Sequence, residues 1–260
     1  LQAQGKDGVP ALQKAVALLP DDAAAHNNLG NALNAIGQLD GAAASYRRAL
    51  AIKPDFVMSH SNLGHTLNAL GQFDGAAASC RRALALKPDY AEAHNNLGVA
   101  LQALGRFAEA ETSYCRAVEL KPDFADAYYN LSAFLFEQGR YAEAEASLRR
   151  TLQLKPDFPE ADINLALLLN AQGKPEMALN IISQSLQVKE TAAAKGIFIA
   201  CVKRIRFAHA SEALRDAMVR ALSEPWGRPA DFAGIGADIV KLNQSVGECV
   251  ERAAIAWPCR

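Results

Sequence analysis

The stretch that decides the fold is HNNLGNALNAIGQLDGAAASYRRALAIKPD, residues 26–55, which returns as HSNLGHTLNALGQFDGAAASCRRALALKPD at residues 60–89. The proline near its end recurs at intervals of 34 residues. A period of this length is typical of a solenoid, in which each repeat buries its apolar face against its neighbours. The recurring prolines are Pro20, Pro54, Pro88, Pro122 and Pro156.

Each repeat is numbered here from the residue three places after its proline. Position 7 is always leucine, position 8 is small, position 15 is always glycine and position 20 is always alanine. Small residues allow two helices to approach closely, and a glycine between them tolerates the left-handed conformation that ends the first helix. The aspartate after each proline is expected to cap the next helix. The position-7 leucines are Leu29, Leu63, Leu97, Leu131 and Leu165.

Leu-Gly, a later alanine and a terminal proline resemble the tetratricopeptide repeat (TPR) family. This resemblance implies an all-α, right-handed superhelical solenoid of helix-turn-helix repeats. We expect residues 1–20 to be a partial repeat that keeps only its second helix, and residues 191–260 to form a helical cap or a junction to a missing downstream domain. The start at LQAQ, without methionine, suggests a fragment of a longer protein. The five expected repeats are 21–54, 55–88, 89–122, 123–156 and 157–190.

Position 6 is asparagine in all five repeats, whereas positions 5 and 9 vary. Asparagine is a mediocre helix former, because its side chain competes for backbone hydrogen bonds. Its recurrence inside a helix therefore needs a cause. Two explanations stay open: the amides face a ligand, or each amide bonds a neighbouring repeat. We call these five residues the ladder asparagines: Asn28, Asn62, Asn96, Asn130 and Asn164.

The repeated asparagine resembles the asparagine ladder of O-linked N-acetylglucosamine transferases, and resemblance to the TPR family implies that the first helix of each repeat lines a concave groove. An amide there offers donors and an acceptor to a peptide main chain without reading its sequence. We therefore predict a peptide-binding surface of ladder asparagines and of further side chains at positions 5 and 9. The further residues are Asn27, Asn31, His65, Asn95 and Tyr129.

Composition argues against several classes of partner. Lys and Arg total 27 against 28 Asp and Glu, which lacks the basic excess of a nucleic-acid-binding protein. No apolar run approaches the roughly 20 residues of a membrane helix. The five cysteines form no C-x-x-C motif, which favours a reduced, cytoplasmic setting. The histidines His26, His60 and His94 recur one repeat apart, too far for one zinc ion, so we predict a packing role and no metal.

The sequence contains no P-loop, dinucleotide-binding glycine motif or catalytic triad, so we expect neither a catalytic residue nor a cofactor. We predict a non-enzymatic scaffold that binds a protein or peptide, with self-association through exposed solenoid ends as a further interaction. The alternative is the substrate-recognition region of a larger bacterial transferase, for methyl or glycosyl groups. The segment RALSEPWGRP, residues 220–229, resembles the region after the repeats in bacterial TPR proteins that carry a methyltransferase-like domain.

Overall fold

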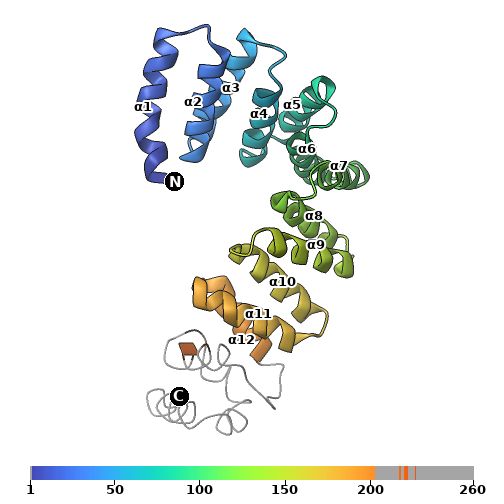
Figure 1. Cartoon of the computed structure of the whole chain (residues 1–260). Helices are drawn as coiled ribbons and strands as arrows, with labels where there is room; N and C mark the ends of the chain where they lie inside the picture. Colours follow the sequence, from blue (N-terminus) through green and yellow to red (C-terminus); the bar gives the residue numbers. More distant parts are fainter. Residues whose placement is uncertain (1, 203–216, 218–219, 222–225, 227–260) are drawn as a thin grey trace. The chain divides into compact units, whose positions relative to one another are not determined.

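The computed structural model describes residues 2–202, 217, 220, 221 and 226, with side chains from residue 8. This part of the chain contains twelve α-helices and no strand, which confirms an all-α helical repeat solenoid (Figure 1). The helices are α1 (Gln2–Leu18), α2 (Ala23–Ala35), α3 (Leu39–Ile52), α4 (Val57–Ala69), α5 (Phe73–Leu86), α6 (Ala91–Ala103), α7 (Phe107–Leu120), α8 (Ala125–Glu137), α9 (Tyr141–Leu154), α10 (Pro159–Ala171), α11 (Pro175–Val188) and α12 (Ala192–Val202).

The chain forms two compact units that divide inside α8, between Phe134 and Leu135. In the first unit, α2 pairs with α3, α4 with α5 and α6 with α7, and each pair falls within one 34-residue interval. The first helices of neighbouring repeats also contact one another, so that α4 lies between α2 and α6 (Figure 1). These contacts place positions 5, 6, 9 and 12 of successive repeats beside each other.

The two helices of a repeat approach most closely at position 8, where the sequence predicted a small residue. A Cβ atom added to Gly64 would lie 2.3 Å from Sγ of Cys80, and one added to Gly98 would lie 2.7 Å from the ring of Tyr114. Cys80 is fully buried and Tyr114 nearly so, which leaves neither side chain room to withdraw. The alanine at position 20 is also fully buried in every repeat: Ala42, Ala76, Ala110, Ala144 and Ala178.

The glycine at position 15 ends the first helix of each repeat in the left-handed conformation, as predicted. The φ angles lie between 72° and 77°, where other L-residues are strained. The amide of the following residue bonds back into the helix, as Arg106 N does to Leu101 O at 2.9 Å. These glycines are Gly37, Gly71, Gly105, Gly139 and Gly173.

The predicted capping role of Asp55, Asp89 and Asp157 is wrong. The N-cap of the following helix is the next residue, an aromatic one such as Phe56, and it makes no side-chain capping bond. The reason is a tight turn over Lys-Pro-Asp-Phe, in which Phe56 N donates to Lys53 O at 3.2 Å. Because the aspartate lies within this turn, the helix starts one residue later than predicted.

The first repeat has an aspartate where the others have an aromatic residue. Asp22 therefore stands at the N-cap of α2, and its Oδ1 accepts from Ala24 N at 2.8 Å and from Ala25 N at 3.3 Å. In the other turns the lysine lies over the aromatic ring, a favourable cation–π arrangement. Nζ lies 5.5, 5.3, 4.7 and 4.2 Å from the ring centroid in the pairs Lys53–Phe56, Lys87–Tyr90, Lys121–Phe124 and Lys155–Phe158.

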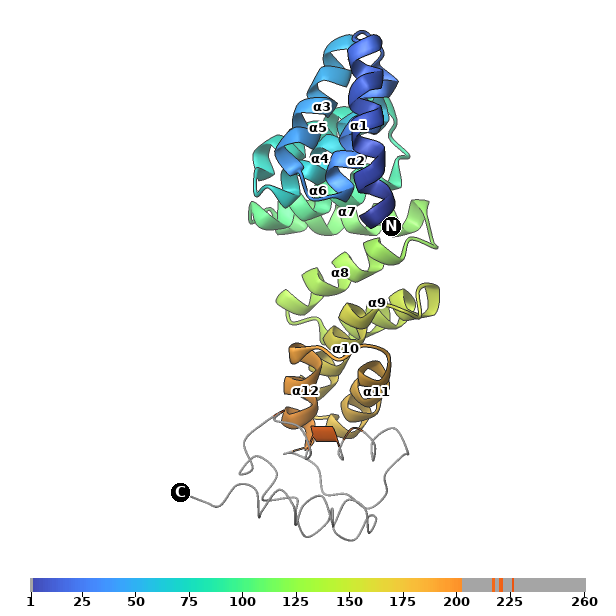
Figure 2. The same ribbon diagram turned by 90° about the vertical axis from the view of Figure 1, so that its left-hand side faces the viewer.

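In the second unit, α10 packs on α9 and α11, and α12 contacts both α10 and α11 (Figure 2). Phe198 of α12 is fully buried and meets the ring of Trp226 edge-on at a centroid distance of 5.8 Å. Lys195 Nζ lies 4.6 Å from the centroid of the same ring. The rest of the predicted cap, residues 203–260, lies outside the described residues apart from 217, 220, 221 and 226.

Candidate functional site

Three ladder asparagines use their amide N–H groups to bond the preceding repeat. Nδ2 of Asn62 donates to Oδ1 of Asn31 at 3.0 Å and to Oδ1 of Asn27 at 3.3 Å. Nδ2 of Asn130 donates to Oδ1 of Asn95 at 3.0 Å. Of the two explanations that the sequence left open, bonding between repeats is therefore present at these positions.

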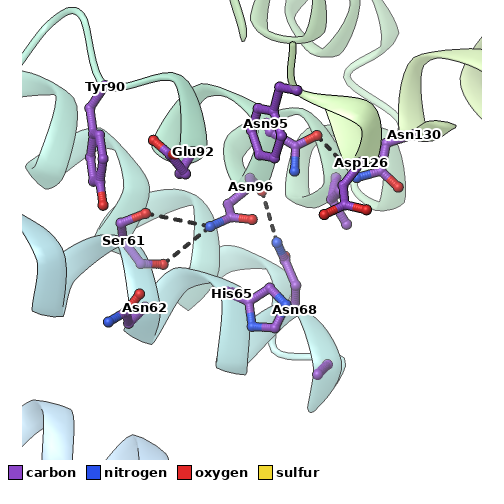
Figure 3. Close-up of a pocket in the computed structure, with 13 residues that line it drawn as sticks. Ser61, Asn62, His65, Asn68, Tyr90, Glu92, Asn95, Asn96, Asp126 and Asn130 are labelled. Atoms are coloured by element: carbon purple, nitrogen blue, oxygen red, sulfur yellow. Dashed lines mark hydrogen bonds between the residues drawn. The ribbon is translucent and has the colours of Figure 1, made fainter. Parts of the chain in front are cut away.

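The third of these asparagines has an unambiguous orientation. Nδ2 of Asn96 donates to the main-chain oxygen of Ser61 at 3.3 Å and lies 3.5 Å from its hydroxyl. A main-chain carbonyl only accepts hydrogen bonds, so the amide nitrogen of Asn96 faces Ser61 and its carbonyl oxygen faces the other way. The same rule fixes Asn68, whose Nδ2 donates to Asn96 O at 2.8 Å (Figure 3).

The first helices of the second, third and fourth repeats border a cleft of about 550 Å³. All of its walls belong to the first unit, and Figure 3 shows the asparagines of α4, α6 and α8 converging on it. We call it the α4–α6–α8 cleft. Its lining residues are Ser61, Asn62, His65, Asn68, Ala69, Tyr90, Glu92, Asn95, Asn96, Val99, Phe124, Asp126 and Asn130.

One hydrogen-bond acceptor in the lining of this cleft is left unsatisfied. The Oδ1 atom of Asn68 is buried without a hydrogen-bond partner among the described residues. The amide nitrogens of Asn62, Asn96 and Asn130 are occupied by the preceding repeat, so their carbonyl ends point away from those bonds. An acceptor left unpaired in a protein interior costs about 1–3 kcal/mol, so the cleft is suited to a ligand that brings donors.

Two carboxylates, Glu92 and Asp126, line the cleft, whereas no lysine or arginine does. Glu92 Oε1 accepts from Lys121 Nζ at 2.8 Å. Burial raises the pKa of Glu92, but this bond and the nearby positive charges outweigh burial and hold the pKa below its usual value. Glu92 is therefore ionised at neutral pH.

His65 supplies no positive charge at neutral pH, because desolvation lowers its pKa below the ordinary value of 6.5. Its imidazole then offers one donor and one acceptor nitrogen to the cleft. The negative charge of Glu92 is matched by the positive charge of Lys121, which bonds it at 2.8 Å.

The structure brings together half of the predicted peptide-binding residues. Asn62, His65, Asn95, Asn96 and Asn130 line the cleft. The other five do not, and their roles in binding stay predictions. Asn27 is only 3% exposed and accepts a hydrogen bond from Ser59 Oγ at 3.0 Å, and Asn31 accepts one from Tyr46 Oη at 2.8 Å. Asn28 is exposed to solvent. Tyr129 is half-buried on α8, and Asn164 is half-buried on α10 in the second unit.

The predicted peptide-binding residues do not include several residues of the cleft, among them Asn68, Tyr90, Glu92 and Asp126. Glu92 and Asp126 share position 2, which holds alanine and methionine in the first two repeats. Position 2 is acidic in the third, fourth and fifth repeats but not in the first two, so a search for residues shared by all five repeats passes over it. Position 2 is nonetheless on the same helix face as positions 5, 6 and 9, and that spacing was the available signal.

The recurrent histidines bond the chain that precedes them. Nε2 of His26, His60 and His94 lies 3.0, 2.8 and 2.9 Å from the carbonyl oxygen of the proline six residues earlier. A carbonyl oxygen only accepts, so Nε2 carries the proton in each case. Each histidine therefore fixes the turn before its helix.

Metal-binding clusters and membrane-spanning helices are absent from the described part of the chain. No group of three or more His, Cys, Asp or Glu side chains in it could hold a metal ion. Cys80, Cys115 and Cys201 are not in disulfide bonds. Among the residues that the structure describes, no helix combines the length and apolarity needed to cross a bilayer.

Comparison with protein families identifies the type of repeat. Family models described as TPR repeat match residues 30–71 and 64–105, and models described as tetratricopeptide repeat match residues 11–44, 100–159 and 135–196. The chain belongs to the tetratricopeptide repeat family. No curated protein matches this TPR protein. Its resemblances to O-linked N-acetylglucosamine transferases and to methyltransferase-linked proteins stay predictions.

Solved TPR structures share the fold. MamA is 27% identical, with 61% of this chain and 93% of MamA covered at a TM-score of 0.52. A thermophilic TPR protein from Thermus thermophilus is 25% identical, with 68% and 98% covered at a TM-score of 0.60. YrrB, described as a TPR protein with an unusual peptide-binding site, is 22% identical, with 71% and 95% covered at a TM-score of 0.51.

Proposed function

We propose that this TPR protein is a scaffold that holds an extended segment of a partner protein in the α4–α6–α8 cleft. The observation that carries the proposal is the cleft itself, which is about 550 Å³ in volume and lined by five asparagines. Side-chain amides suit a peptide main chain, which offers alternating N–H donors and C=O acceptors. At 22% identity the likeness to YrrB extends only to the fold, so the proposal depends on the cleft.

The ladder asparagines would then serve two purposes. Their amide N–H groups bond the preceding repeat, and their carbonyl oxygens take part in the wall of the cleft. Triple replacement of Asn62, Asn96 and Asn130 by alanine therefore disturbs both stability and binding. It cannot separate the two roles.

A variant that fills the cleft without removing a bond provides the test. Ala69, the last residue of α4, lines the cleft and is exposed, so Ala69→Trp places a large ring at its edge. Ala78→Trp is the matched control, since Ala78 is exposed on α5 and does not line the cleft. Both variants are expected to keep the helical circular-dichroism spectrum of the native chain.

The measurement is selection of binders from a phage-displayed library of random peptides, followed by calorimetry with synthetic copies. We expect the native chain and Ala78→Trp to bind the selected peptides alike, and Ala69→Trp to lose roughly tenfold or more in affinity. Failure of the library to yield any binder, or equal binding by the two tryptophan variants, would overturn the proposal.

A further inference from the structure

The helix α1 has the register of a second helix of a repeat. Leu19 N, just after it, donates to Ala15 O at 2.8 Å, as Lys53 N does to Ala49 O at the end of α3. α1 also contacts α2, as α3 contacts α4 and α5 contacts α6. Among the described residues no first helix of the same repeat precedes α1, which lies at the end of the row of helices (Figure 1).

The face of α1 that a first helix would cover is open. Position 24 is at most 3% exposed and position 27 at most 4% exposed in the five repeats, whereas their counterparts in α1, Leu12 and Ala15, are only half-buried. Position 20 is a fully buried alanine in the five repeats, but a Cβ atom added to its counterpart Gly8 would meet nothing within 4 Å. We call Gly8, Leu12 and Ala15 the α1 face.

The ladder asparagine of the repeat after α1 also lacks its usual partner. Asn62, Asn96 and Asn130 each donate to position 5 of the repeat before their own. Asn28 is exposed and makes no side-chain hydrogen bond among the described residues. Position 5 of a preceding first helix would supply the acceptor, as Asn95 Oδ1 does for Asn130 at 3.0 Å.

We propose that the α1 face binds an α-helix of another protein, and that this helix has the sequence pattern of the first helices of this chain. The bound helix presents leucine at its position 7 and a small residue at its position 8 to the α1 face, and an acceptor at its position 5 to Asn28. It would extend the row of α2, α4 and α6, whose neighbouring members contact one another. This site is separate from the α4–α6–α8 cleft.

A second copy of the chain is a poorer occupant. Its helices α2, α4, α6 and α10 already pair with the second helices of their own repeats. The helix α12 buries its apolar side chains, including Phe198 and Val202, which are fully buried. The described part of a second copy therefore offers no first helix with a free apolar face.

The size of Leu12 indicates which small residue the bound helix carries. Position 8 is glycine in the three repeats that have tyrosine or cysteine at position 24. The repeat with Leu148 at position 24 has Ser132 at position 8, and the repeat with Ile182 has Ala166. Leu12 is also aliphatic, so we expect alanine or serine at position 8 of the bound helix, and a larger side chain would overpack the contact.

The probe is a fluorescent peptide that copies residues 89–105 of this chain with the change Gly98→Ala, and its binding to the full chain is followed by fluorescence anisotropy. A matched peptide carries Gly98→Leu instead. Leucine forms helices almost as well as alanine, so the comparison reports on the space at Leu12. We expect the alanine peptide to bind and the leucine peptide to lose roughly tenfold or more in affinity.

Protein variants test the α1 face. Ala15→Trp places a ring on it and is expected to abolish binding of the alanine peptide. Ala17→Trp is the control, because Ala17 is exposed on the same helix at a position that is exposed in every repeat. Ala69→Trp, which alters the α4–α6–α8 cleft, is expected to leave this binding unchanged.

A double-mutant cycle tests the hydrogen bond. Asn28→Ala is expected to weaken the alanine peptide several-fold, and adding Asn95→Leu to that peptide is expected to weaken it to the same extent. The two changes remove the same bond, so together they are expected to cost no more than either alone. Additive losses would show that Asn28 does not bond position 5 of the bound helix.

Three outcomes would overturn the proposal. The first is equal binding of the alanine and leucine peptides, or equal binding by the two α1 tryptophan variants. The second is a dimer, detected by sedimentation, that Ala15→Trp dissociates and the alanine peptide does not displace, because a second copy would then cover the α1 face. The third is failure of the protein isolated at its natural length to bind the alanine peptide, which would show that the chain covers this face itself.

Discussion

Gly64→Ala tests the contact that lets α4 approach α5. Since α4 carries five residues of the cleft, this contact also positions the candidate site. The added Cβ would lie 2.3 Å from Sγ of Cys80 and 3.3 Å from the carbonyl oxygen of Ala76. Carbon atoms in ordinary contact are about 3.5–4.0 Å apart, so the helices must separate by roughly 1 Å.

The change in stability caused by Gly64→Ala is the sum of two opposing effects. Overpacking of a rigid core costs about 1–3 kcal/mol, and Cys80, at 0% exposure, has no space into which to turn. Alanine in a helix interior is favoured over glycine by about 1 kcal/mol. The 2.3 Å contact puts the overpacking cost in the upper half of its range, at about 2–3 kcal/mol, so we expect Gly64→Ala to destabilise the α4–α5 pair by about 1–2 kcal/mol. Gly75→Ala is the control, because its Cβ meets only the end of Leu67 at 3.3 Å, and it is expected to be neutral or slightly stabilising.

A double-mutant cycle identifies the clash as the cause. Cys80→Ala removes Sγ and by itself costs about 1 kcal/mol for the small cavity. In the Gly64→Ala/Cys80→Ala chain the clash is gone, so its loss of stability is expected to be at least about 1 kcal/mol smaller than the sum of the two single losses. Native-state hydrogen exchange of α4 and α5 amides is the assay, because repeats open locally. Strict additivity of the two changes would refute the reasoning.

Three further predictions concern stability. Asn96→Ala removes the hydrogen bond from the nearly buried Asn96 amide to the Ser61 carbonyl and is expected to cost about 1–2 kcal/mol in urea unfolding. Asn28→Ala, at an exposed position, is expected to change stability by less than about 0.5 kcal/mol, and equal effects of the two changes would contradict the bonding between repeats. Gly105→Ala forces φ of 73° on an L-residue and is expected to cost about 1–2 kcal/mol by the same measurement, an unchanged stability being the contrary result. Burial raises the pKa of Asp162 from 3.8 to about 6, so the folded chain holds this proton more tightly than the unfolded chain. The stability linked to it is complete below pH 3.8 and is lost as the pH rises through about 6. Asp162→Asn is expected to flatten that part of the profile of unfolding free energy against pH, and an unaltered slope would disprove the linkage.

The sequence predicted those parts of the fold that local geometry determines. Glycine at position 15 is required by the left-handed φ at that residue, and the small residue at position 8 by the closeness of the two helices. Both recur because every repeat makes the same turn and the same contact. The capping prediction failed at Asp55 because a turn of four residues and a helix cap compete for the same aspartate, and the turn through Phe56 prevails.

The candidate site was only partly predictable for a different physical reason. An asparagine side chain can donate or accept, and the choice at Asn96 is made by Ser61, a residue 35 positions earlier. Glu92 and Asp126 stand at a position that is acidic only in the last three repeats, so they give a weaker periodic signal than the asparagines do. The recurrence of asparagine therefore identified the helix face, whereas the orientation of the amides could be determined only from the structure.

The hydrogen bonds that join positions 5 and 6 of neighbouring repeats in the first unit all run the same way, from a donor at position 6 of one repeat to an acceptor at position 5 of the repeat before it. Position 6 supplies a donor, and position 5 supplies an acceptor in Asn27, Ser61 or Asn95. A copy of residues 89–122 spliced in after residue 122 would bring both halves of the joint with it. The insertion could be repeated, and each inserted repeat would add one further asparagine amide at position 6.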